Sequence, residues 1–116
     1  MRKKIIFCFF FAITFSQALI AQSTIDKKYV NNRIVQSTEH TKLGGGKEQV
    51  VIKSYLFSED KVANTTVYFT VNGKKDGEYK YYSGSNLIEH SIFKNGVLDG
   101  DNIRYYDNGK IQYKEK

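Results

Sequence analysis

Two histidines, His40 and His90, are the side chains of this sequence best suited to acid–base or metal chemistry. Neither is followed by a second histidine or a carboxylate two or four positions later, the spacing that would build a preformed ligand pair. Glu89 lies beside His90, but neighbours on a strand point to opposite faces of a sheet. We therefore predict exposed or edge histidines and no metal site.

Other residue patterns that resemble chemical motifs lack the surroundings that the chemistry requires. No serine lies in a nucleophile-elbow pattern, so a Ser-His-Asp triad is not expected. After the run Gly44-Gly45-Gly46-Lys47 comes Glu48, where a phosphate loop needs Ser or Thr. The pairs Asp76-Gly77 and Asp99-Gly100 lack the dense acids of a calcium loop. The sequence predicts a protein that is not an enzyme and needs no cofactor.

Tyrosine is the residue type with the most suggestive distribution, because it occurs as two adjacent pairs with a basic residue beside each pair. The candidate binding residues are Tyr81, Tyr82, Tyr105, Tyr106, Lys80 and Arg104. If repeats stack in register, Tyr81 and Tyr105 line one face and the second members of the pairs line the other. An exposed column of this kind would suit docking a protein, stacking on a sugar ring or contacting lipid headgroups. The alternative is that these tyrosines are architectural and pack the hairpins.

The elements that would position these tyrosines are short β-strands. Residues 49–57 and 65–71 are rich in β-branched and aromatic residues, which favours strands. Further strands are expected over residues 78–82, 87–93, 101–106 and 110–114. The 116 residues contain no proline, which is consistent with uninterrupted hydrogen-bonded ladders.

Three Asn-Gly dipeptides separate the later strands, and this dipeptide is the one that best adopts the two positive φ angles of a type I′ hairpin turn. The predicted turn residues are Asn72, Gly73, Gly77, Asn95, Gly96, Gly100, Asn108 and Gly109. Strands joined by such turns form an antiparallel meander. The predicted fold is all-β, with hairpin repeats stacked into a small elongated sheet.

A repeat is visible around the first two of these turns. Residues 72–77 recur as residues 95–100, a period of 23, whereas the tyrosine pairs are 24 residues apart. The second copy therefore carries one extra residue after its glycine in this alignment. Periods of this length are typical of stacked supersecondary units, and the strands at 49–57 and 65–71 would then form a degenerate first unit.

The spacing of glycines, Asn-Gly turns and aromatic residues over 72–82, 93–100 and 105–111 resembles the bacterial variant of the MORN repeat, found in YwqK-type antitoxin proteins. The resemblance covers residues 66–116. It implies stacked β-hairpins, no catalytic centre and a role in contacting other proteins. Eukaryotic relatives of the repeat are linked to membranes and lipids. The alternative partner, suggested by the aromatic and basic residues, is an envelope lipid headgroup or a cell-wall glycan.

The amino terminus has the pattern of a secretory signal peptide. Arg2, Lys3 and Lys4 precede the apolar run 5–15, which is shorter than the roughly 20 residues of a membrane-spanning helix. Cleavage is expected after Ala21, with Ala18 as the alternative site, and the competing interpretation is an uncleaved membrane anchor or a buried helix. Cleavage would remove the single cysteine, Cys8, and leave no transmembrane span. The predicted location is the periplasm, the cell surface or the extracellular medium.

Charge also limits the partners of the exported part. Removing the three cations of the signal from the 18 basic residues leaves 15, against 12 acidic residues. Basic and acidic residues alternate along the chain, whereas nucleic-acid binders gather basic residues on one face. The predicted organisation is a signal peptide at 1–21, a polar segment with a glycine-rich joint at 22–48, and a MORN-like domain at 49–116 with clear repeats at 72–94 and 95–116. Its predicted function is to bind an unidentified protein without catalysis.

Overall fold

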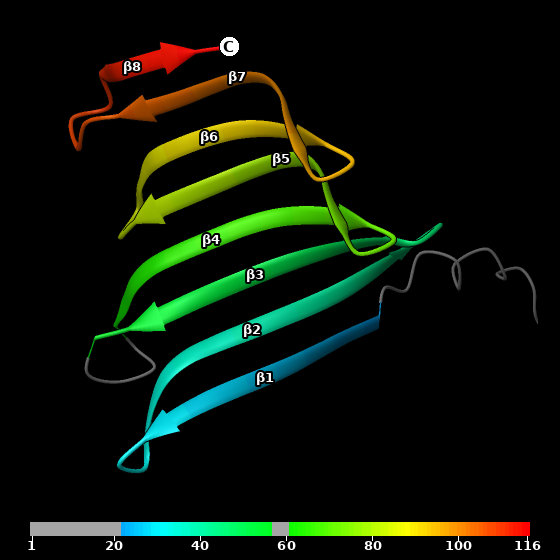
Figure 1. Ribbon diagram of the computed structural model, residues 1–116. Helices are drawn as coiled ribbons and strands as arrows, with labels where there is room; N and C mark the ends of the chain where they lie inside the picture. Colours follow the sequence, from blue (N-terminus) through cyan, green and yellow to red (C-terminus); the bar gives the residue numbers. More distant parts are fainter. Residues whose placement is uncertain (1–21, 57–60) are drawn as a thin grey trace, which may run out of the picture.

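The computed structural model describes residues 22–56 and 61–116, and these form one antiparallel sheet. The signal peptide and Cys8 lie outside the described residues. The eight strands are β1 (Gln22–Val30), β2 (Arg33–Gly44), β3 (Lys47–Tyr55), β4 (Val62–Val71), β5 (Lys74–Ser83), β6 (Asn86–Lys94), β7 (Val97–Tyr105) and β8 (Ile111–Glu115). Each strand pairs with the next one along the chain (Figure 1). The fold is all-β and a hairpin meander, as predicted.

The amino-terminal segment, which the sequence predicted only as a polar segment with a glycine-rich joint, contributes two full strands to the same sheet. Asn31 and Asn32, with φ of 51° and 62°, form the turn between β1 and β2. The Gly44–Gly46 run is the tight connection between β2 and β3 and is not a flexible joint. Because β3 begins at Lys47, the sheet continues through the boundary that the sequence placed at residue 48.

The Asn-Gly turns are of two kinds. Asn72 and Asn95 both have a φ of 52° and are followed by glycines at 86° and 85°, which confirms the predicted type I′ geometry. The third turn differs, because Asn108 does not have a positive φ. The Gly109 amide donates to the Tyr106 carbonyl at 2.9 Å, and the Asn108 side chain accepts from the Lys110 amide at 2.9 Å. The type I′ prediction for Asn108-Gly109 is therefore wrong.

The sequence repeat corresponds to a repeated hairpin with an unchanged period of 23. In the first hairpin, β4–β5, Tyr68 pairs with Tyr79. In the second, β6–β7, Ser91 pairs with Asn102, and the register shifts directly after this pair in both hairpins. The structural unit is thus two strands plus a bulge, and it extends back to residue 62.

A glycine occupies each of the two bulges, which explains why the Asp-Gly pairs recur. Gly77 and Gly100 have φ of 110° and 124°, values that residues with a side chain rarely adopt. An added Cβ would lie 3.7 Å from the Cβ of Phe69 at the first bulge and 3.4 Å from that of Ile92 at the second. These two glycines are bulge residues on the strands and not parts of the hairpin turns.

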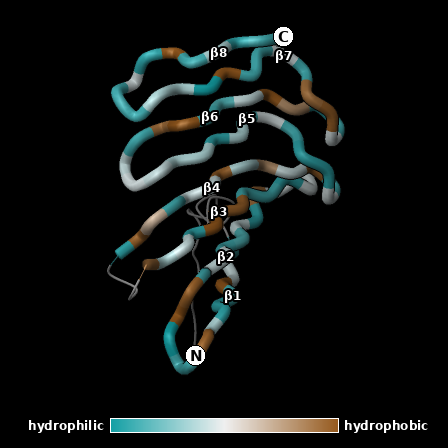
Figure 2. The backbone as a smooth tube through the Cα atoms, turned by 60° about the vertical axis from the view of Figure 1, so that its left-hand side comes forward, coloured by the Kyte–Doolittle hydropathy of each residue, from teal (hydrophilic) through white to brown (hydrophobic). Residues whose placement is uncertain are grey.

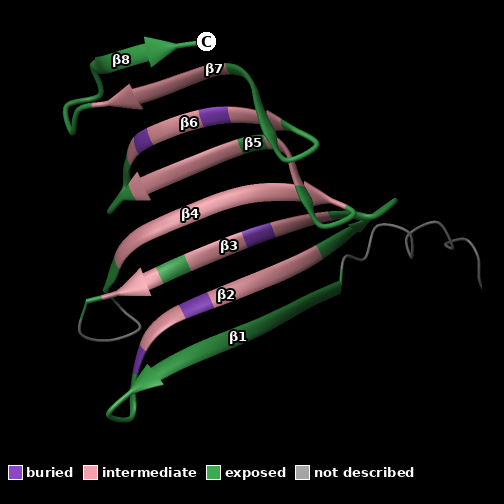
Figure 3. Ribbon diagram, in the orientation of Figure 1, coloured by how far each residue is buried: buried purple, intermediate pink, exposed green. Residues whose placement is uncertain are grey.

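The described part of the chain is a single layer, with little enclosed core. The buried apolar residues are Ile34, Val50 and Ile88, and the buried polar residues are Ser37 and Ser91. Most other strand residues are half-buried, and β1 and β8 are exposed along their length (Figure 3). Apolar segments are spread over several strands and do not gather in one place (Figure 2).

Register divides the side chains between two faces. Face A carries the paired row Val50, Tyr68, Tyr79, Ser91 and Asn102. Face B carries the neighbouring row Val51, Val67, Lys80, His90 and Ile103. Among residues 22–56 and 61–116 there is no helix long and apolar enough to cross a membrane.

Candidate binding surfaces on the sheet

The predicted tyrosine columns do not form. Tyr81 pairs with Glu89, which pairs with Arg104, so these three share face A. An ion pair between Arg104 Nη1 and Glu89 Oε1 at 3.4 Å confirms that the last two side chains lie on the same side. Tyr105 follows Arg104 directly on β7. The register shift at this point places its extra residue, Gln112, on β8, so the side chains of β7 still alternate and Tyr105 lies on face B. The prediction that Tyr81 and Tyr105 share a face is wrong.

The placement of Tyr81 and Tyr105 on opposite faces follows from the 23-residue period of the hairpins. Tyr82 pairs with Thr65 and Leu87 on face B, and its equivalent one period later is Tyr105. The tyrosine pairs are 24 residues apart, and a slip of one residue moves a strand's side chains to the other face. Tyr106 lies beyond the end of β7, 52% exposed, and its amide donates to the Lys110 carbonyl at 2.8 Å.

Face B has a shallow hollow that contains two of the predicted binding residues, Lys80 and Tyr82. The hollow has a volume of about 180 Å³, and its lining residues are Gln49, Val67, Phe69, Glu78, Lys80 and Tyr82. Lys80 Nζ lies 3.7 Å from Glu78 Oε1, and Lys47 Nζ lies 5.1 Å from the centroid of the Phe69 ring. Aromatic rings, an amide and charged groups thus converge at one place.

Face A carries an aromatic cluster that the sequence analysis missed. The rings of Tyr68, Tyr79 and Phe93 come from β4, β5 and β6, and the Lys75 ammonium lies over all three. Burial raises the pKa of Tyr79 above its ordinary value of 10.0, and the charge of Glu89 adds to this effect. The only signal in the sequence was the aromatic content of three separate strands, because their register was not known.

Both histidines have a carboxylate partner on the adjacent strand. His40 Nδ1 lies 3.4 Å from Glu48 Oε1, and His90 Nε2 lies 3.2 Å from Glu78 Oε2. Residue spacing along one strand does not reveal these pairs, because each partner lies on the next strand. In the described part of the chain, no three or more His, Cys, Asp or Glu side chains gather as a metal site would need.

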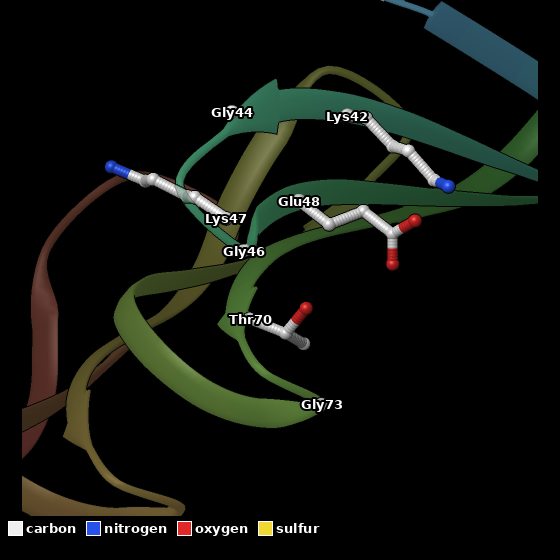
Figure 4. A pocket seen from close by; sticks show the side chains of 7 residues that line it. All are labelled: Lys42, Gly44, Gly46, Lys47, Glu48, Thr70 and Gly73. Carbon is white, nitrogen blue, oxygen red and sulfur yellow. The ribbon is translucent and has the colours of Figure 1, made fainter.

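The glycine-rich turn lies beside a second hollow, of about 260 Å³, at the end of the β2–β3 hairpin. Lys42 and Glu48 project to the same side of this hairpin, and Lys47 projects to the other (Figure 4). The Gly46 carbonyl accepts from the Asn72 amide at 2.9 Å, so the turn is tied to the next hairpin. The carboxylate of Glu48 makes this hollow a poor site for a phosphate.

The two outer strands carry exposed apolar side chains. In the described sheet β1 pairs only with β2, and β8 pairs only with β7. On β1, Ile25 and Tyr29 are 56% and 57% exposed, and on β8, Ile111 and Tyr113 are 55% and 44% exposed. Each outer strand therefore combines an unpaired backbone edge with apolar side chains.

Comparison with protein-family models, characterised proteins and solved structures gave no match. Function must therefore be argued from these surfaces.

Proposed function

We propose that this chain is an exported, non-catalytic repeat module that binds a protein partner along the outer edge of β1. The observation that carries the proposal is that β1 is exposed along its length, over all nine residues, and pairs on one side only, with β2, in the described sheet. An edge of this length is a template for an additional strand.

The side chains of β1 support the same conclusion. Natural edge strands are usually short, interrupted by proline or strongly charged, because those features prevent pairing with other chains. β1 carries the charged residues Asp26, Lys27 and Lys28, but it is nine residues long, has no proline and also exposes the apolar side chains of Ile25 and Tyr29. β8 is the less favourable edge, because it has only five residues.

Two expectations from the sequence complete the proposal. The amino-terminal signal places the partner outside the cytoplasm, in the periplasm, at the cell surface or in the medium. The MORN-type resemblance supports contact with a protein, and the antitoxin-like description rests on that resemblance only.

Crosslinking capture from the envelope fraction, with the tagged protein as bait, tests the proposal. We expect one dominant partner, reduced at least tenfold by Ile25→Lys/Tyr29→Lys, because charge at these positions opposes docking of an apolar strand. Tyr81→Ala/Tyr105→Ala, which alters one residue on each face and leaves β1 intact, is the matched control and should retain the partner. A partner that the β1 variant keeps and the control loses would overturn the assignment to β1.

The hollow on face B favours a second candidate, an envelope glycan. Phe69 and Tyr82 offer rings on which a sugar can stack, and Gln49 and Glu78 offer hydrogen-bonding groups beside them. If no protein is captured, glycan pull-down with wild type and Tyr82→Ala distinguishes this candidate. Retention of a glycan by wild type alone would support it.

A further inference from the structure

Three aromatic rings on face A surround one ammonium group. The Nζ of Lys75 lies 5.2, 5.0 and 5.2 Å from the ring centroids of Tyr68, Tyr79 and Phe93. The Tyr68 and Tyr79 rings are stacked with centroids 6.2 Å apart, and Phe93 meets Tyr79 edge-on at 6.0 Å. We call these three rings the cage. Its members stand on adjacent strands, so the sheet holds their spacing.

The fold does not require the cage. The two tyrosines and the lysine have equivalents one period later in the second hairpin, and these are Ser91, Asn102 and Leu98. The second hairpin has the same register and the same bulge without a ring or a cation at these positions. The cage therefore combines two tyrosines of the first hairpin with Phe93 of the second, and it is not a part of the repeat.

The lysine can leave the cage without moving the sheet. Its carbonyl accepts from the Gly96 amide at 2.7 Å, and the neighbouring Asp76 side chain accepts from the Asn95 amide at 3.2 Å. These bonds hold the backbone against the next hairpin. The side chain of Lys75 is half-buried and has a flexible four-carbon stem, so rotation about its bonds exposes the rings.

The chemistry of the cage favours a different cation from the one it holds. A primary ammonium has three N–H donors, and ring faces replace only part of the hydrogen bonding that water gives them. A trimethylammonium group has no N–H donor, so it loses less on leaving water and keeps the attraction to the rings. Such groups are the typical ligands of aromatic cages.

We infer that the cage is a binding site for a trimethylammonium group, with the Lys75 side chain as its internal competitor. This site lies on face A and is independent of the proposed docking along β1. Failure of one proposal leaves the other intact, because the two use different residues and different ligands.

Titration of the purified protein with tetramethylammonium chloride tests the inference. Binding is monitored by tyrosine fluorescence and NMR, and sodium chloride at equal ionic strength is the blank. We expect saturable binding that tightens at least tenfold in Lys75→Met, which keeps an apolar stem and removes the competing charge. Lys75→Gln removes the charge with a different side chain and should give the same gain. Adding Phe93→Leu to either variant should weaken binding at least tenfold.

The matched control is Lys47→Met, because Lys47 lies over the single ring of Phe69 on face B. No gain is expected there. The inference is overturned if neither Lys75 variant binds more tightly than wild type, if Lys47→Met gains equally, or if binding survives loss of the Phe93 ring. Choline and phosphatidylcholine vesicles, added to Lys75→Met, then distinguish a free ligand from a lipid headgroup.

Discussion

Tyr79 is the residue at which packing most clearly changes chemistry. Its ring contacts Tyr68 and Phe93 and lies under the Lys75 ammonium. Burial is the main cause that raises the pKa of its hydroxyl, and the charge of Glu89 raises it further. Both effects oppose the anionic form, so the folded protein favours the neutral tyrosine.

We expect this tyrosine to make stability fall at alkaline pH. In the unfolded chain a tyrosine titrates near a pKa of about 10. Because the folded pKa is higher, the unfolded state loses its proton first, so this contribution is complete below pH of about 10 and is lost as pH rises through the folded value. Urea unfolding between pH 8 and 11 should show a smaller loss of stability for Tyr79→Phe than for wild type. Tyr29→Phe, on the exposed edge, should behave like wild type, and an equal fall in Tyr79→Phe would contradict the prediction.

At the residue scale, the sequence could predict types of side chain but not their partners. The partners of His40 and His90 come from adjacent strands, and no spacing along one strand reveals them. The cage is a stronger case, since its successive rings lie 11 and 14 positions apart and meet only through the pairing of β4, β5 and β6. The chemically distinctive contacts depend on register.

At the scale of the elements, the bulges determine which residues share a face. Each repeated hairpin has its bulge at the same position, opposite Phe69 in one and Ile92 in the other. The Asn-Gly turns around residues 72 and 95 were predictable because the dipeptide determines the local backbone. The faces on which the tyrosines lie were not predictable. The tyrosine pairs are 24 residues apart and the hairpins repeat every 23, so an alignment on the tyrosines assigns them to faces with an error of one residue.

Gly100→Ala should destabilise the second hairpin. The residue has a φ of 124°, and the new Cβ would lie 3.4 Å from the Cβ of Ile92. Strain of this kind costs about 1–3 kcal/mol. Chemical denaturation of both proteins measures the difference.

The control for this change is Gly45→Asn, in the turn between β2 and β3. Gly45 has a φ of 64°, which asparagine tolerates, and an added Cβ would meet nothing within 4 Å. We expect a much smaller loss of stability for this variant. Equal losses in the two variants would show that the bulge contributes nothing beyond ordinary glycine substitution.

The amino-terminal strands mark another limit of prediction at this scale. β1 and β2 are rich in polar residues, so neither matches the alternating apolar pattern of a half-buried strand. They form because β3 offers an edge and the Asn31-Asn32 turn closes the hairpin. Tertiary pairing here outweighs composition.

At the scale of the whole molecule, each described strand pairs only with its neighbours in the sequence. Repeat proteins of this kind have a stability close to the sum of their units and the interfaces between neighbours. The buried residues lie on β2, β3 and β6, and these are Ile34, Ser37, Val50, Ile88 and Ser91. β8 pairs with β7 only from Asn102 to Tyr105.

Hydrogen exchange followed by mass spectrometry should therefore show a gradient across the sheet. We expect the slowest exchange in β2 to β6 and the fastest in β1 and β8, because outer strands lack one neighbour and have little burial. A uniform exchange rate across all strands would instead indicate a single cooperative unit. Bound partner on β1 should slow exchange at that edge alone.

The serial order of the strands also determines how the molecule would respond to force. β1 and β8 lie at opposite edges of the sheet, so tension applied to the two ends of the described chain would act across the hydrogen-bonded ladders and not along them. In that geometry the hydrogen bonds between two paired strands break one after another and not all at once. The sheet would peel from its outer strands at low force, and each hairpin would lengthen the chain in one step.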